Sequence, residues 1–275
     1  MKTWNTNHYS RKTLLLSGFL LLIHCISYGQ NLPHRESDEM YKKTITRALD
    51  LREKQNKGLF SKNCEITRLL IEAAKKNKIT AYSNDSLVSK LTSAQLQERL
   101  KKPSAGPTIN INNPADTVDA FIAYGPDWRD QIPTEEEYLA NDLYQLEIKE
   151  EILFDKEKSK LMYNILSISL FIPADHPANI KGLQAPVASF NFEELTTCLF
   201  NNNPKAIWYN CQNEAQHKNL SEAFALRLFS SYIVKVSNAD DYYLTDIYSD
   251  QLKGIMASQW EANKLMEYEH HLWEY

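Results

Sequence analysis

The stretch "LYQLEIKEEILFDKEKSKLMYNILSISLFI", residues 143–172, decides the fold. Apolar and polar residues alternate through "LYQLEIKEEILF" and again through "KLMYNILSISLFI", which is the period of a half-buried β-strand. The charged run "DKEKS" between them is typical of a turn. The sequence therefore predicts a long antiparallel hairpin from Leu143 to Ile172.

Further strands and short helices are expected to surround this hairpin. The segments "NFEELTTCLF" and "LSEAFALRLF" favour short helices, and "RLFSSYIVKVSN", residues 227–238, alternates like another strand. Apolar residues recur at roughly helical spacing from Asp250 to Tyr275, which predicts a C-terminal helix. We therefore expect residues 138–275 to form an α+β core.

The chain before the hairpin has mostly helical spacing. "SDEMYKKTITRALDLREKQNKGLF" predicts an amphipathic helix that ends near Gly58, and its apolar positions are Tyr41, Ile45, Ala48 and Leu49. "EITRLLIEAAKKNKITAY" and "LTSAQLQERL" predict two more helices, the second capped by Thr92 or Ser93. Residues 30–101 are therefore expected to form an N-terminal helical region.

Residues 102–137 differ in character from both neighbours. Five prolines, two glycines and several asparagines interrupt every periodic run in this segment. An irregular stretch of this length is uncommon inside a compact domain. It is expected to be a connector, either a boundary or a loop committed to binding.

The first 29 residues are typical of a secretory signal peptide. A positively charged beginning is supplied by Lys2, Arg11 and Lys12. The apolar run "LLLSGFLLLI", residues 14–23, is too short for a mature membrane-spanning helix. Small residues, Ser27 and Gly29, stand at the −3 and −1 positions, so cleavage is expected between Gly29 and Gln30.

The sequence around the signal favours soluble export. Lipidation of Cys25 would need a small residue before the cysteine, whereas this chain has His24. No later segment has the roughly 20 apolar residues of a spanning helix. Loss of the signal lowers the Lys+Arg count from 31 to 28 against 35 Asp+Glu, a net charge of −7. This charge argues against binding to nucleic acid or to an anionic lipid surface.

Three cysteines follow the cleavage site, which permits one internal disulfide at most. Cys198 and Cys211 are the plausible pair, because a short loop separates them and exported proteins meet an oxidising compartment. The alternative is that Cys64 and these two are small buried hydrophobic residues.

The adjacent serines in "RLFSSYIV" raise the question of a nucleophile. Ser230 and Ser231 are expected in mid-strand, on opposite faces, between the bulky Phe229 and Tyr232. A catalytic serine usually stands on a strained turn beside small residues, with a base nearby. Close packing of a strand is therefore the better interpretation.

Other catalytic and cofactor motifs do not occur. The 7 glycines are too scattered for a nucleotide-binding loop, and there is no C-x-x-C or H-E-x-x-H metal motif. Side chains of the adjacent His270 and His271 would diverge by about 100° on a helix, which does not suit a chelate. Acidic pairs such as Glu147 and Glu151 are too common in this chain to indicate a hydrolase. No cofactor or metal is expected.

Aromatic residues are more informative about function. The chain has 15 Tyr, 10 Phe and 5 Trp, and several occur in polar segments such as "YGPDWRD", "IWYNC" and "EHHLWEY". Such residues dominate protein interfaces. They also stack on sugars, so a glycan- or peptidoglycan-binding module that uses Trp128 or Trp208 is the alternative.

Four motifs follow one another along the chain: "LDLREKQNKGLF" at residues 49–60, the lysine-rich hairpin "EIKEEILFDKEKSKL", "RLFSSYIVKVSN" and the closing "LWEY". In these motifs and in their order, from about Asp38 to Tyr275, the chain resembles the GldN/PorN family of gliding-motility and type IX secretion proteins. The motif residues are candidates for structural or interface roles: Leu51, Arg52, Glu53, Lys54, Arg227, Phe229, Ser230, Ser231, Tyr232, Trp273 and Tyr275.

The resemblance implies a non-enzymatic structural subunit in the periplasm. It implies a ring built with an outer-membrane lipoprotein of the GldK/PorK type and with neighbouring copies of the same chain. It also implies contact with the periplasmic part of a GldM/PorM-type motor protein. The subunit would then lie at the inner face of the outer membrane, held there through its partner.

Overall fold

The computed structural model describes residues 39–103, 136–155, 160–179, 181–201, 203–248 and 250–273. The expected signal peptide, with Gly29 and Gln30, lies outside these residues, as do most of the connector, Trp128 and Tyr275. The described residues from Met40 onward form one compact unit.

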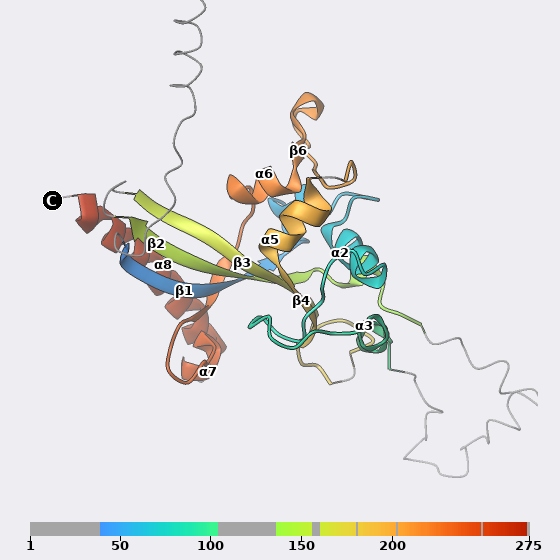
Figure 1. Cartoon of the computed structure of the whole chain (residues 1–275). Coiled ribbons are helices and arrows are strands. Elements are labelled where there is room, and N and C mark those ends of the chain that lie inside the picture. Colours follow the sequence, from blue (N-terminus) through green and yellow to red (C-terminus); the bar gives the residue numbers. More distant parts are fainter. Residues whose placement is uncertain are drawn as a thin grey trace, which may run out of the picture. The chain divides into compact units, whose positions relative to one another are not determined.

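A five-stranded antiparallel sheet is the centre of this unit (Figure 1). Its strand order is β4-β3-β2-β1-β7. The strands are β1 (Glu39–Asp50), β2 (Gln145–Asp155), β3 (Lys160–Ile172), β4 (Ala185–Asn191) and β7 (Tyr232–Val236). The predicted hairpin is confirmed: β2 and β3 pair from Gln145 opposite Phe171 to Asp155 opposite Lys160.

The expected first helix is wrong, because residues 39–50 form strand β1 between β2 and β7. The apolar positions that suggested a helix include Tyr41, Ile45 and Leu49, and their spacing of four also fits a strand, where every second side chain shares a face. The sequence "KTITR" contains three β-branched residues in a row, which favour a strand. Pairing with strands far away in the sequence decides between the two periods.

The other predicted helices are present. They are α2 (Ile66–Lys75), α3 (Ser93–Leu100), α5 (Phe192–Glu194) continuing into the π-helical η5 (Leu195–Phe200), α6 (Leu220–Ala225) and α8 (Gln251–Trp273). Thr92 is the N-cap of α3, where its side chain accepts from the Gln95 amide and the Gln95 side chain accepts from the Thr92 amide.

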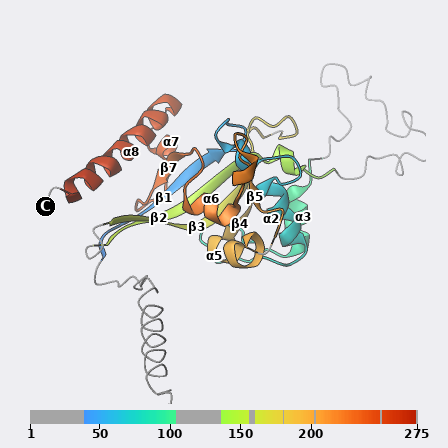
Figure 2. The same cartoon turned by 90° about the horizontal axis from the view of Figure 1, so that it is seen from above.

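Several short elements complete the described chain. They are η2 (Asn56–Leu59), η4 (Ala140–Asp142), η6 (Glu214–Gln216), α7 (Leu244–Tyr248) and the two-stranded pair β5 (Ile207–Trp208) and β6 (Lys218–Asn219). Figures 1 and 2 both show α8 at the opposite end of the long strands from α2, α3 and α5.

Two hydrophobic clusters stabilise this arrangement. The larger one joins residues on both sides of the connector, such as Leu70 of α2 and Phe190 of β4. The smaller one lies under α8, where Ala257 and Leu265 pack with Ile233 of β7. The expected N-terminal and C-terminal regions therefore share one core.

Candidate protein-interaction surface

Asn56 joins two of the motifs that carry the family resemblance, "LDLREKQNKGLF" (the first motif) and "RLFSSYIVKVSN" (the second motif). Its side chain is buried, and its Nδ2 donates to the carbonyl oxygens of Asp50 at 2.8 Å and Ser230 at 3.0 Å. The Ser230 amide donates in return to Asn56 Oδ1 at 2.7 Å. The "LREKQN" and "RLFSS" segments, 174 residues apart at this contact, therefore meet in space.

The two serines have a structural place that differs from the prediction. β7 begins at Tyr232, so Ser230 and Ser231 precede the strand and do not lie within it. Ser230 bonds to Asn56 through its backbone, which does not need a reactive hydroxyl. Within β7, Ile233 faces the core and Tyr232 is 52% exposed.

Arg227 anchors the second motif to the hairpin through Glu150. The Glu150 carboxylate is fully buried and accepts from Arg227 Nη1 at 2.7 Å and Nη2 at 3.2 Å. Arg47 of β1 donates to the same carboxylate through Nε. The Arg227 guanidinium also lies over the rings of Tyr163 and Phe229, at 4.6 and 5.3 Å from their centroids.

Glu150 occupies a position where the strand pattern calls for an apolar residue. Period two places it between Ile148, which belongs to the larger cluster, and Ile152, which belongs to the smaller one. A buried carboxylate needs cationic partners. The three-residue network of Arg47, Glu150 and Arg227 therefore separates the two hydrophobic clusters.

Arg52 of the first motif organises an exposed polar cluster. Its Nη2 donates to Asp50 at 2.8 Å and its Nη1 to Asp175 at 3.2 Å, while the guanidinium lies 3.7 Å from the centroid of the Tyr144 ring. Tyr144 donates to Asp175, and burial together with this hydrogen bond raises the pKa of Tyr144 to about 12. The Tyr144 hydrogen bond is also the main reason that the pKa of Asp175 is lowered.

The remaining motif residues divide between core and surface. Leu51 is fully buried, Glu53 and Lys54 are exposed, and Phe229 is half-buried, 5.6 Å from Phe224 between ring centroids. Trp273 is the last residue of α8.

The expected Cys198–Cys211 disulfide does not form in this structure. All three described cysteines are free, with Cys198 and Cys211 exposed and Cys64 half-buried. Cys198 lies on the solvent side of η5, whose Leu199 and Phe200 point into the core. The alternative of three buried cysteines is therefore wrong as well.

Gly58 in the first motif is needed for close packing against Trp208. A Cβ atom at this position would lie 2.5 Å from Trp208 Nε1 and 2.9 Å from the Tyr209 carbonyl oxygen. The Tyr209 amide also donates to the Gly58 oxygen at 2.8 Å. The indole Nε1 is thus enclosed, and it has no hydrogen-bond partner among the described residues.

We expect Gly58→Ala to lower the free energy of unfolding by about 1–3 kcal/mol, because the added methyl group forces the Trp208 indole and the Tyr209 backbone apart. Urea denaturation measures the change. Lys57→Ala, at an exposed position of the same turn, is the control and should change stability by less than about 0.5 kcal/mol. Equal effects of the two variants would contradict the packing argument.

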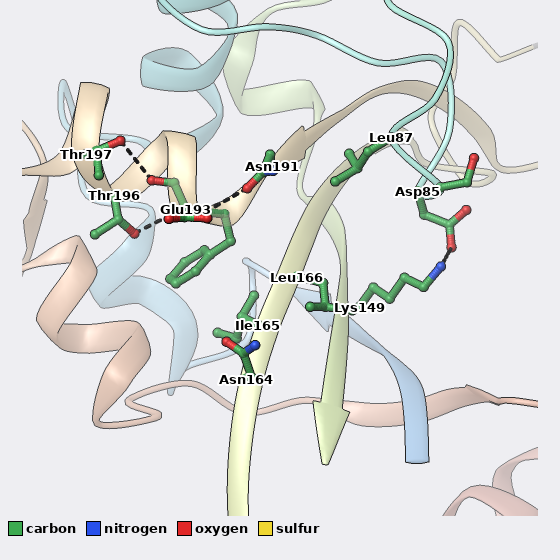
Figure 3. Close-up of a pocket in the computed structure, with 12 residues that line it drawn as sticks. Asp85, Leu87, Lys149, Asn164, Ile165, Leu166, Asn191, Glu193, Thr196 and Thr197 are labelled. Atoms are coloured by element: carbon green, nitrogen blue, oxygen red, sulfur yellow. Dashed lines mark hydrogen bonds and ion pairs between the residues drawn. The ribbon is translucent and has the colours of Figure 1, made fainter. Parts of the chain in front are cut away.

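A cavity of about 570 Å³ lies between β3, the start of α5 and the loop around Asp85 (Figure 3). Its polar groups bond mainly to one another or to nearby backbone. Lys149 Nζ lies 3.1 Å from Asp85 Oδ2, Asn191 Oδ1 accepts from the Glu193 amide, and Thr196 Oγ1 donates to the Phe192 carbonyl. This internal pairing leaves the cavity with little to recognise a ligand.

Among the described residues, large apolar side chains that are more than half exposed are most numerous on α8. Its sheet-facing side is buried through Ala257, Ser258 and Leu265. On the opposite side, large apolar residues are 52–60% exposed, and we call them the α8 outer face: Leu252, Ile255, Met256, Trp260 and Met266. A helix that is apolar on both sides is normally buried on both sides.

The neighbouring helix extends this apolar surface. Ile247 and Tyr248 of α7 are 47% and 41% exposed, and α7 lies directly before α8 in the chain. Gly254 permits the close approach of the two helices, because a Cβ there would lie 2.9 Å from Thr245 Cγ2. None of the helices that the structure describes is both long and apolar enough to cross a membrane.

The protein is therefore an α+β protein in which one side of α8 packs on the sheet, while the α8 outer face is exposed and available to a partner. A family model described as "Gliding motility associated protein GldN" matches residues 34–274. The chain therefore belongs to the GldN family. A search of curated proteins finds no match.

Sequence reasoning missed Glu150 and Asn56 as the residues that connect the motifs. A signal for Glu150 was available, since it is the one charged residue in the alternation Leu146, Ile148, Glu150, Ile152, Phe154. Asn56 gave no comparable signal, because a buried asparagine and a turn asparagine look the same in a sequence.

Proposed function

We propose that this protein is a non-enzymatic structural subunit of the type IX secretion and gliding machinery in the periplasm. It forms a ring with neighbouring copies and with an outer-membrane lipoprotein of the GldK/PorK type, and it contacts a GldM/PorM-type motor protein. Its mechanism is assembly without turnover. Membership of the GldN family and the export signal expected in the first 29 residues support this proposal.

The α8 outer face is the observation that carries the proposal. Apolar side chains more than half exposed at Leu252, Met256 and Trp260 cost free energy in water, and contact with another protein removes that cost. Tryptophan and methionine are enriched at the centres of such interfaces. We assign this face to the lipoprotein partner.

Trp260→Glu tests this assignment. A buried charge at the centre of an interface is expected to reduce co-purification of the lipoprotein from the native envelope by at least about ten-fold. The tagged protein is purified in mild detergent, its partners are identified by mass spectrometry, and ring particles are counted by negative-stain imaging.

Gln97→Glu is the matched control. It adds the same charge at an exposed position of α3, on an element that Figures 1 and 2 place far from α8, and should leave partner recovery unchanged. Full recovery of the lipoprotein with Trp260→Glu would refute the assignment of this face. Recovery of a lone monomer from the wild-type chain would refute the ring.

A further inference from the structure

A second cavity, of about 670 Å³, lies where β1, β2 and β7 meet α7 and α8. Tyr232, Val234, Tyr243 and Ile255 are among its lining residues and supply aromatic and apolar walls. Gln145, Glu147 and Asp50 also line it and supply polar groups. The volume is in the range of pockets that hold small ligands or single side chains.

Glu147 is the principal polar group of this cavity. Glu147 is buried, with 7% of its surface exposed. Its carboxylate accepts hydrogen bonds from Tyr243 OH at 3.2 Å and from Gln184 Nε2 at 3.5 Å. Among the described residues, no lysine or arginine forms an ion pair with it. Lys235 lies nearby, with its Nζ 5.5 Å from the centroid of the Tyr243 ring, but this ammonium group pairs with Asp241 Oδ1 at 2.6 Å.

Gln145 adds a second polar side chain to the wall of the same cavity. It lies two positions before Glu147 on β2, so both side chains share one face of the strand. Its Oε1 atom is enclosed and has no hydrogen-bond partner within the described part of the chain. Glu147 is therefore the acceptor on which recognition of a ligand depends.

We propose that this cavity binds the ammonium or guanidinium group of a lysine or arginine side chain from a partner polypeptide. The cation donates to the Glu147 carboxylate. Tyr232 lines the same cavity and supplies an aromatic wall for the aliphatic stem and the charge, since aromatic faces attract cations. Acidic and aromatic residues around one cavity thus define the chemical class of the ligand.

The polypeptide source follows from the position of the cavity. Ile255 belongs both to the cavity wall and to the α8 outer face, so a protein that covers the outer face can insert a side chain here. This choice of source rests on the proposed function. The cation site itself does not, because small probes test it on the purified protein alone.

The experiment is a calorimetric titration of the full purified chain at pH 8 and low salt. The probe is Nα-acetyl-lysine methylamide, and Nα-acetyl-norleucine methylamide serves as the uncharged probe of similar shape. We expect the lysine probe to bind at least about ten-fold more tightly than the norleucine probe, as expected for hydrogen bonds to a buried charged group.

Variants locate the binding in this cavity. Glu147→Gln should weaken the lysine probe by about ten-fold, while Glu151→Gln should leave it unchanged. Glu151 lies on the same strand outside the cavity and pairs with Lys42 at 2.8 Å. Tyr232→Leu, at an exposed position that tolerates replacement, should weaken binding about two- to five-fold.

Each outcome decides the proposal. Equal affinity of the wild-type chain and Glu147→Gln, or of the two probes, would overturn the cation site and leave the ring proposal standing. If n-butylammonium binds as tightly as the lysine probe, the peptide groups are not recognised and a free amine replaces the polypeptide as the ligand. Tighter binding of the lysine probe supports the polypeptide.

Discussion

Replacing Glu150 with alanine is expected to lower the free energy of unfolding by about 3–5 kcal/mol, a large fraction of the stability of an ordinary domain. The carboxylate is fully buried and holds Arg47 and Arg227, whose side chains are 15% and 30% exposed. Its removal leaves two partly buried guanidinium groups without the carboxylate that they share. Chemical denaturation followed by circular dichroism measures the loss.

Glu151→Ala is the matched control for this prediction. Glu151 is the next residue of β2, and its partner Lys42 is 53% exposed at the side chain, so the pair resembles a surface ion pair. Such pairs contribute about 0–1 kcal/mol. If Glu150→Ala were no more destabilising than Glu151→Ala, the network would not be what holds the second motif against the hairpin.

The hairpin could be predicted because its information is local. Alternation over eleven residues of β2 and thirteen of β3 specifies two strands, and the charged run after β2 marks the point where the alternation is interrupted. α3 was equally accessible, since Thr92 and Gln95 form a capping box within four residues. Elements whose signals lie within their own residues can be read from the sequence.

β1 could not be predicted because its conformation depends on distant partners. Ile45 and Leu49 fit a helical period and a strand period equally well, and the choice is made by β2 and β7. The register opposite β7 also shifts between Thr46 and Arg47, a local irregularity that no sequence period reveals. Tertiary pairing overrides local spacing in such segments.

The candidate surfaces also combine features that local sequence predicts with contacts that depend on residues far away in the chain. Recurring apolar residues in the last segment correctly predicted α8, but the periodicity did not reveal which side meets the sheet. The Asn56–Ser230 contact and the Arg227–Glu150 pair span 174 and 77 residues. One sequence without its partners cannot place such contacts, even where the motifs that contain them can be recognised.

Glu147 is expected to make the protein less stable as the pH rises from about 4.5 to above 7. Burial is the main cause that raises the pKa of this carboxyl from 4.5 to about 7 in the folded chain. Hydrogen bonds from Tyr243 and Gln184 and the charge of Lys235 oppose this effect, while the charge of Asp85 adds to it.

The sign of this pH dependence follows from the proton affinity of Glu147 in the folded and in the unfolded chain. The folded protein holds the Glu147 proton more tightly than the unfolded chain does, so this contribution to stability is complete below pH 4.5 and is lost as the pH rises through 7. At about 1.4 kcal/mol per pH unit, the loss amounts to about 3 kcal/mol.

Other groups titrate in the same pH range. The quantity to measure is therefore the difference in unfolding free energy between the wild-type chain and Glu147→Gln. That difference should change by about 3 kcal/mol in favour of the variant between pH 4.5 and 8. It should stay flat for Glu151→Gln, and a flat profile for Glu147→Gln would mean that the carboxyl is solvated or already paired with a cation.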